Sequence, residues 1–85
     1  MSSWFSRVEQ EHEAGNLTAT QYLVLCELGR RLEGGELRIR QEELAAHARC
    51  TVRTVQHTLQ AARRLGLVEW TSVGKFNRYH LGVSR

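Results

Sequence analysis

The spacing of hydrophobic positions predicts a helical front part and a strand-rich end. Trp4, Phe5 and Val8 share one face of a short amphipathic helix that stops at an Ala-Gly-Asn run. A second helix begins after Thr18 and runs to about Leu32. Its start fits a capping box, in which a Thr side chain and a Gln three residues later each bond the other's backbone N–H.

The middle of the chain predicts one short strand and two further helices. Residues 37–39 alternate apolar and polar side chains, which is enough for a short strand. Residues 41–47 read as a short helix whose acidic first turn suits the helix dipole, and a tight turn follows. Thr51 caps the next helix, which runs to about Leu65 and closes at Gly66.

The helix predicted at 51–65 has two contrasting faces. Its apolar positions recur at helical spacing and predict a buried face: Val55, Leu59, Ala62 and Leu65. The opposite face carries Val52, Arg53, Gln56, His57, Gln60, Arg63 and Arg64. No acidic residue occurs on this helix, which is unusual for a face that only contacts water, because such faces normally mix Glu with Lys.

After Gly66 the pattern changes to a period of two. Residues 67–71 and 76–81 both alternate, and the turn-like residues between them complete a predicted β-hairpin. Trp70 and Tyr79 lie on opposite strands of this hairpin, so we expect them to pack on each other and on the core.

The composition is that of an ordinary folded domain and gives no sign of catalysis. Of the 85 residues, 41% are hydrophobic and 25% are charged. The chain has no Asp, no paired-carboxylate constellation and no Gly-rich phosphate loop, so we expect neither an enzyme nor a cofactor. Its four His residues lack metal-ligand spacing, and Cys26 and Cys50 read as small core residues, so no metal site is expected.

Nothing in the sequence predicts a membrane or secretory segment. No apolar run approaches the ~18 residues of a membrane span. The first residues also lack the apolar stretch of a signal peptide. We therefore expect a cytoplasmic protein with no membrane contact.

Charge is divided unevenly along the chain, although the formal net charge is only +3. Residues 1–48 hold five Arg against eight Glu, a net of −3. Residues 49–85 hold six Arg and Lys75 against Glu69 alone, a net of +6. This asymmetry favours a polyanionic partner for the C-terminal half, with a merely solvated basic face as the alternative.

Residues 41–59, QEELAAHARCTVRTVQHTL, resemble a helix-turn-helix signature. The matching positions are Leu44 and Ala45 on the first helix, Cys50 in the turn, Thr51 as the cap, and Val55 and Leu59 on the second helix. Together with the preceding helix, the short strand and the hairpin, the chain from Leu17 to Val83 is similar to the winged helix-turn-helix domains of bacterial transcription regulators and plasmid or phage replication initiators. One departure is Arg49, which stands where the turn often has Gly and favours a slightly longer turn.

The resemblance implies a mostly helical α+β fold and a nucleic-acid partner. A winged helix-turn-helix domain would occupy 17–85, with an extra helical segment at 1–16. Double-stranded DNA would be bound by helix 51–65 in the major groove, in association with the nucleoid. The expected base-reading residues are Val52, Arg53, Gln56 and His57. The expected phosphate or wing contacts are Gln41, Arg49, Thr51, Thr54, Gln60, Arg63, Arg64, Lys75, Asn77 and Arg78.

Three functions stay open on the sequence. Sequence-specific regulation of transcription comes first, and the DNA-binding module of a replication initiator or partition protein comes second. A winged helix used for protein contact is the third, because a fold alone never fixes a function. Trp4, Phe5 and Val8 also allow either a homodimer or packing on their own domain.

Overall fold

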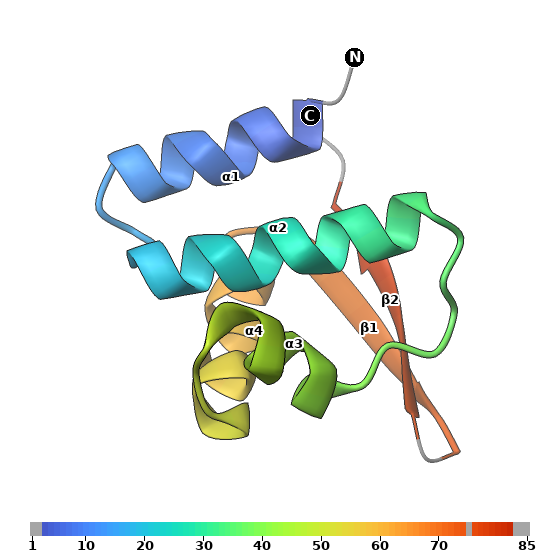
Figure 1. Ribbon diagram of the computed structural model, residues 1–85. Helices are drawn as coiled ribbons and strands as arrows, with labels where there is room; N and C mark the ends of the chain where they lie inside the picture. The colour runs from blue at the N-terminus through green and yellow to red at the C-terminus, as the bar shows by residue number, and fades with distance from the viewer. Residues whose placement is uncertain (1–2, 75, 83–85) are drawn as a thin grey trace.

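The computed structural model describes residues 3–74 and 76–82 of the chain. Its elements follow in the order α1 (Ser3–Glu13), α2 (Ala19–Glu33), α3 (Gln41–Ala48), α4 (Val52–Arg64), β1 (Val68–Val73) and β2 (Phe76–Leu81) (Figure 1). The mostly helical α+β class predicted from the sequence is confirmed. None of the helices in these residues is both long enough and apolar enough to cross a membrane.

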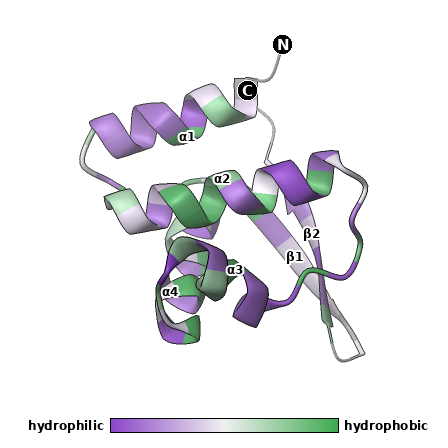
Figure 2. Cartoon of the chain, in the orientation of Figure 1, coloured by the Kyte–Doolittle hydropathy of each residue, from purple (hydrophilic) through white to green (hydrophobic). Residues whose placement is uncertain are grey.

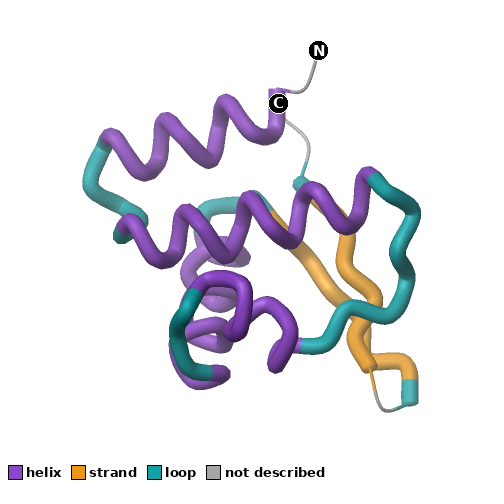
Figure 3. The backbone as a smooth tube through the Cα atoms, viewed as in Figure 1, coloured by secondary structure: helices purple, strands orange, loops and turns teal. Residues whose placement is uncertain are grey.

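Helix α2 lies at the centre of the molecule. Helix α1 lies along one side of α2 and runs in the opposite direction, while α3, α4 and the hairpin lie on the other side (Figures 1 and 3). Figure 2 shows the hydrophobic stretch of α2 between these two layers. Gly29 permits the close approach of α1, because a Cβ at this position would lie 2.5 Å from the Trp4 ring and 2.9 Å from the Phe5 ring.

One hydrophobic core joins all the elements. Its buried members are Trp4, Val8, Leu17, Val24, Leu25, Leu28, Ile39, Leu44, Ala45, Val55, Leu59, Ala62, Leu67, Val68 and Tyr79. The Trp4 indole Nε1 donates to the Leu67 carbonyl at 2.7 Å, a buried bond that ties α1 to the start of the hairpin. Trp4 and Val8 therefore pack on their own domain, and Phe5 lies half-buried, edge-on to Trp4.

Helices α1, α2, α3 and α4 end in the same hydrogen-bonded motif. In each, a residue with positive φ follows the helix, and the next backbone N–H reaches back to a carbonyl in the last turn. Glycine takes this position at Gly15, Gly35 and Gly66, and Arg49 takes it after α3 with φ 55°. The expected longer turn is therefore wrong: residues 49–51 form the connection, and Arg49 adopts the left-handed conformation itself.

The capping box predicted at the start of α2 is confirmed. Thr18 and Gln21 bond each other's backbone N–H as expected, and α2 extends to Glu33, one residue beyond the predicted end. The predicted ends of α1, α3 and α4 likewise agree with the structure to within one or two residues.

The strand expected at 37–39 is not formed, which corrects the sequence-based fold. No backbone hydrogen bond among the described residues involves these three. Ile39 is buried while Leu37 is 62% exposed, and Ile39 lines a hollow of about 310 Å³ with Phe76 and Tyr79 of β2. Side-chain burial alone places Ile39 here, without the ladder of hydrogen bonds that defines a strand.

The hairpin has a tighter turn than the sequence predicted. Ser72 and Val73 were expected in the turn, but they belong to β1, and Val73 lies opposite Phe76. β1 thus ends directly before Gly74, which has the positive φ that short hairpin turns require. The pairing register of the two strands decides where β1 ends. The pattern of apolar and polar residues did not reveal that Ser72 and Val73 still pair with β2.

Trp70 and Tyr79 face each other across the hairpin, as predicted. They are paired in register, and their ring centroids lie 6.2 Å apart. Tyr79 is buried and Trp70 is half-buried.

The cysteines are half-buried rather than fully internal. Cys50 packs against the core, while Cys26 lies on α2 next to Tyr22. Burial raises the pKa of the Cys26 thiol, which keeps it protonated and unreactive at neutral pH.

Candidate nucleic-acid interface

Helix α4 begins at its predicted cap, and Val55, Leu59 and Ala62 are buried as predicted, whereas Leu65 follows the helix and is half-buried. The Thr51 hydroxyl oxygen accepts a hydrogen bond from the Thr54 N–H at 3.1 Å and so caps the helix. The buried face consists of Val55, Thr58, Leu59 and Ala62. The hydroxyl of Thr58, the one polar member, donates to the Thr54 carbonyl at 2.7 Å and is thereby satisfied.

Side chains with hydrogen-bond donors cover the opposite side of α4. The outer face of α4 comprises the exposed residues Arg53, Gln56, His57, Gln60 and Arg64. They follow one another at helical spacing, so they project from one side of the helix. Within the described part of the chain, neither Arg53 nor Arg64 has a carboxylate within ion-pair distance. This face therefore presents donors and positive charge with no internal partner for the charge.

Two predicted contact residues lie at the edge of this face. Val52 is half-buried because it packs against the core. The Gln56 amide nitrogen donates to the Gln41 side-chain oxygen at 3.2 Å, which joins α4 to the first residue of α3. The Gln41 amide nitrogen and the Gln56 oxygen stay available, because each Gln side chain has both a donor and an acceptor group.

The turn before α4 brings three predicted phosphate contacts together. Arg49 is exposed in its left-handed conformation, and the Thr51 and Thr54 hydroxyl oxygens lie 3.1 Å apart. A left-handed backbone costs a non-glycine residue about 1–2 kcal/mol. The chain therefore tolerates strain at a position where a guanidinium emerges beside the start of α4.

Arg63 differs from the other arginines of α4 because the hairpin holds it. Its guanidinium carbon lies 3.9 Å from the centroid of the Trp70 ring, and one nitrogen donates to the Trp70 carbonyl at 3.2 Å. The Glu69 carboxylate lies 3.6 Å from Nε. The structure thus gives Arg63 a packing role between α4 and β1, which the sequence did not indicate.

The predicted wing residues do not gather on one side of the hairpin. Asn77 is half-buried, accepts a bond from the Ser72 hydroxyl at 3.3 Å, and lies on the Tyr79 side of the sheet. Arg78 is exposed on the other side, because successive residues of a strand point to opposite faces. Lys75 lies outside the described residues.

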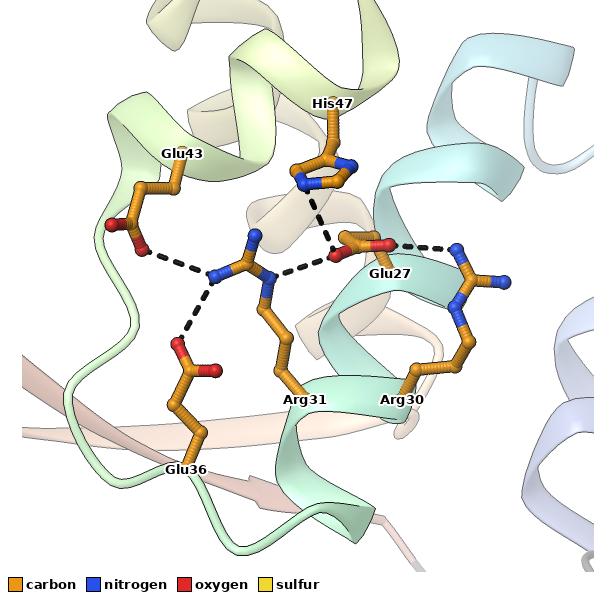
Figure 4. Close-up of polar contacts among 6 residues, drawn as sticks. All are labelled: Glu27, Arg30, Arg31, Glu36, Glu43 and His47. Atoms are coloured by element: carbon orange, nitrogen blue, oxygen red, sulfur yellow. Dashed lines mark hydrogen bonds and ion pairs between the residues drawn. The ribbon is translucent and has the colours of Figure 1, made fainter.

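A second group of charged residues, the Glu27 cluster, joins α2, the loop after it and α3 (Figure 4). Its members are Glu27, Arg30, Arg31, Glu36, Glu43 and His47. The nearly buried Glu27 carboxylate accepts bonds from Arg30 at 2.7 Å and from Arg31 at 2.8 Å. The hydrogen bond from Arg30 lowers the pKa of Glu27 below its usual 4.5, so this carboxylate stays ionised at neutral pH.

Arg31 makes more ion pairs than any other member of the Glu27 cluster except Glu27 itself. Besides Glu27, its guanidinium reaches Glu36 at 3.0 Å and Glu43 at 3.1 Å, so one cation connects three carboxylates from three segments. His47 is exposed, and its Nε2 lies 3.8 Å from the Glu27 carboxylate. The cluster fixes α3 against α2 and thereby positions the turn that leads into α4.

This cluster was not identified from the sequence. The spacing of Glu27 to Arg30 and Arg31, three and four residues apart on a helix, was a usable signal. The partners in the loop and on α3 carry no such signal, because only the tertiary fold brings them to Arg31.

Within the described ranges, no three His, Cys or acidic side chains converge as metal ligands would. Comparison with known proteins found no family model, no curated protein and no solved structure that matches this chain.

Proposed function

We propose that this chain is a winged helix-turn-helix domain that binds double-stranded DNA, with α4 in the major groove, and regulates transcription. The observation that carries the proposal is the outer face of α4, where exposed donors and two arginines have no acidic partner among the described residues. The arginines of the outer face form no ion pair within the described part of the fold, whereas the phosphates of a polyanion would pair with them.

The side chains of the outer face suit the edges of base pairs. Arg53, near the start of α4, has the planar fork that binds guanine O6 and N7, and Gln56 has the donor–acceptor pair that fits adenine. Val52 presents methyl groups beside them, which suit contact with a thymine methyl. His57 lies one turn further along and would donate to a base or a phosphate.

The turn before α4 and the start of α3 would hold the DNA backbone. Arg49, Thr51 and Thr54 supply charge and hydroxyls at the start of α4, and Gln41 supplies an amide at the start of α3. Backbone contacts of this kind fix the register of a protein on DNA without reading its sequence. The backbone N–H groups at the start of α4 add further donors for a phosphate.

The hairpin would act as the wing through Arg78, together with Lys75. Arg63 would support it indirectly by holding β1 against α4, and Asn77 by bonding Ser72 across the strands. A homodimer through α1 has less support, because Trp4 and Val8 are buried in the chain's own core.

A replication or partition protein would use the same outer face, because it reads duplex DNA by the same contacts. A map of bound sites in the cell's genome separates the two roles. Sites at promoters would support the regulation of transcription, and clustered repeats at one origin would contradict it.

Titration of a labelled duplex at rising salt tests DNA binding itself. We expect roughly four to six phosphate contacts, each contributing about −0.9 to the slope of log affinity against log salt. Arg30→Ala is the matched control, because this arginine is already paired with Glu27, and it should leave the slope unchanged. A slope near zero for the wild-type protein would rule out duplex DNA as the partner.

A further inference from the structure

A shallow groove lies beside the outer face, between α4 and the start of α2. The α2–α4 groove has a volume of about 570 Å³ and is lined by Gln21, His57, Gln60, Ala61 and Arg64. Gln21 comes from α2 and the others from α4. No acidic residue lines the groove, although acidic residues are common elsewhere on α1, α2 and α3.

The capping box gives the Gln21 side chain a fixed orientation in this groove. Its oxygen accepts the Thr18 backbone N–H at 2.9 Å, so this end of the amide has to face Thr18. The amide nitrogen therefore points the other way, with two N–H groups that bond no acceptor among the described residues. Gln21 thus presents a donor that is already oriented before any ligand arrives.

Arg64 supplies the charge of the α2–α4 groove. It is exposed and has no carboxylate within ion-pair distance in residues 3–74 and 76–82, in contrast to its neighbour Arg63, which the hairpin holds. Gln60 adds a second amide to the lining. One permanent positive charge beside amide donors matches a singly charged phosphodiester, and the nearby start of α2 favours negative charge as well.

We propose that the α2–α4 groove seats a phosphodiester group of the DNA strand next to the base pairs that α4 reads, bound by Arg64, Gln60 and Gln21. This inference rests on the proposed function and extends the DNA contact from α4 to α2. A phosphate contact carries no information about the base sequence. Two contacts from different helices, however, fix the angle at which α4 enters the major groove of the DNA.

Gln21→Glu tests the contact without removing the helix cap, because Glu and Gln serve equally in a capping box. The new carboxylate would repel a phosphate in the groove. We expect duplex affinity to fall about tenfold on selected and random sequences alike, and the salt slope to flatten by about one unit. Gln10→Glu, on the exposed side of α1, makes the same charge change away from α4 and should alter affinity less than twofold.

Gln60→Glu provides a second test that does not involve the cap, should Gln21→Glu lower the unfolding temperature. Both groove variants should weaken binding more than Gln10→Glu. Equal affinities for a folded groove variant and Gln10→Glu would overturn the inference. If Arg53→Ala still weakens binding in that case, the proposed function stands and only the groove contact fails. A wild-type protein that binds no duplex would overturn both.

Discussion

The Glu27 cluster and the outer face of α4 both contain arginines on a helix, but in the described part of the chain only the arginines of the cluster are paired with carboxylates. In the cluster, Arg31 lies within 3.1 Å of three carboxylates. On the outer face, Arg53 and Arg64 have no acidic partner among the residues that the structure describes. An arginine whose partners are internal stabilises the fold, whereas one without them remains available to an external anion.

Burial adds to this difference. Glu27 is 9% exposed and the Arg31 side chain 18% exposed, so the ion pair between them is largely shielded from solvent, whereas the other partner of Glu27, Arg30, has a 66% exposed side chain. Exposed ion pairs contribute about 0–1 kcal/mol, while breaking a buried pair costs about 3–5 kcal/mol. The two surfaces should therefore respond to substitution in different measurements: the free energy of unfolding for the Glu27 cluster, and DNA affinity for the outer face.

Arg31→Ala should have the largest effect on stability. It leaves three carboxylates without their shared cation, one of them nearly buried, so the free energy of unfolding should fall by about 2–3 kcal/mol. Thermal unfolding should show a loss of roughly 10 °C or more for a domain of this size. Arg64→Ala is the matched control, expected to change stability by less than about 0.5 kcal/mol. Equal losses in the two variants would remove the contrast between the surfaces.

Arg53→Ala should have the complementary effect. We expect a loss of about 1–3 kcal/mol in affinity for a selected DNA site, little change on random duplex, and no measurable loss of stability. Competition binding with both duplexes, together with thermal unfolding, provides the measurement. If affinity for both duplexes falls by the same factor, Arg53 contacts a phosphate and does not read a base.

Arg49→Gly should move stability and affinity in opposite directions, by smaller amounts. Glycine relieves the left-handed strain, so the variant should be more stable by about 0.5–1 kcal/mol, while it loses a phosphate contact and one unit of salt slope. Gly35→Ala is the backbone control, since a Cβ there has nothing within 4 Å. It should lose about 1 kcal/mol of stability and no affinity. Unchanged DNA binding by Arg49→Gly would exclude Arg49 from the interface.

The sequence predicts the helices of this fold well because their signals are local. The Thr18–Gln21 box, the Thr51 cap and the glycines at 15, 35 and 66 act within a few residues of where they stand. The prediction of a strand at 37–39 was wrong. The alternation of apolar and polar residues indicates which side chains are buried, but a strand also needs a partner strand at hydrogen-bonding distance.

The candidate site shows the same difference between local signals, which the sequence reveals, and tertiary contacts, which it does not. The exposed donors of α4 follow from helical spacing, so the sequence identified Arg53, Gln56 and His57 as sharing a face. It did not reveal that Trp70 and the hairpin hold Arg63, or that Gln21 lies beside Arg64. These contacts depend on how α4 sits against β1 and α2, which no local pattern encodes.

The most direct test of the central claim is a residue-by-residue map of backbone amide chemical shifts as duplex DNA is added. We predict the largest changes over residues 49–60, with further changes at Arg78, and little change at Glu27, Arg31 and Glu36. Changes concentrated on the Glu27 cluster, or an outer face of α4 that does not respond at saturating duplex, would contradict the assignment of α4 as the DNA-binding surface.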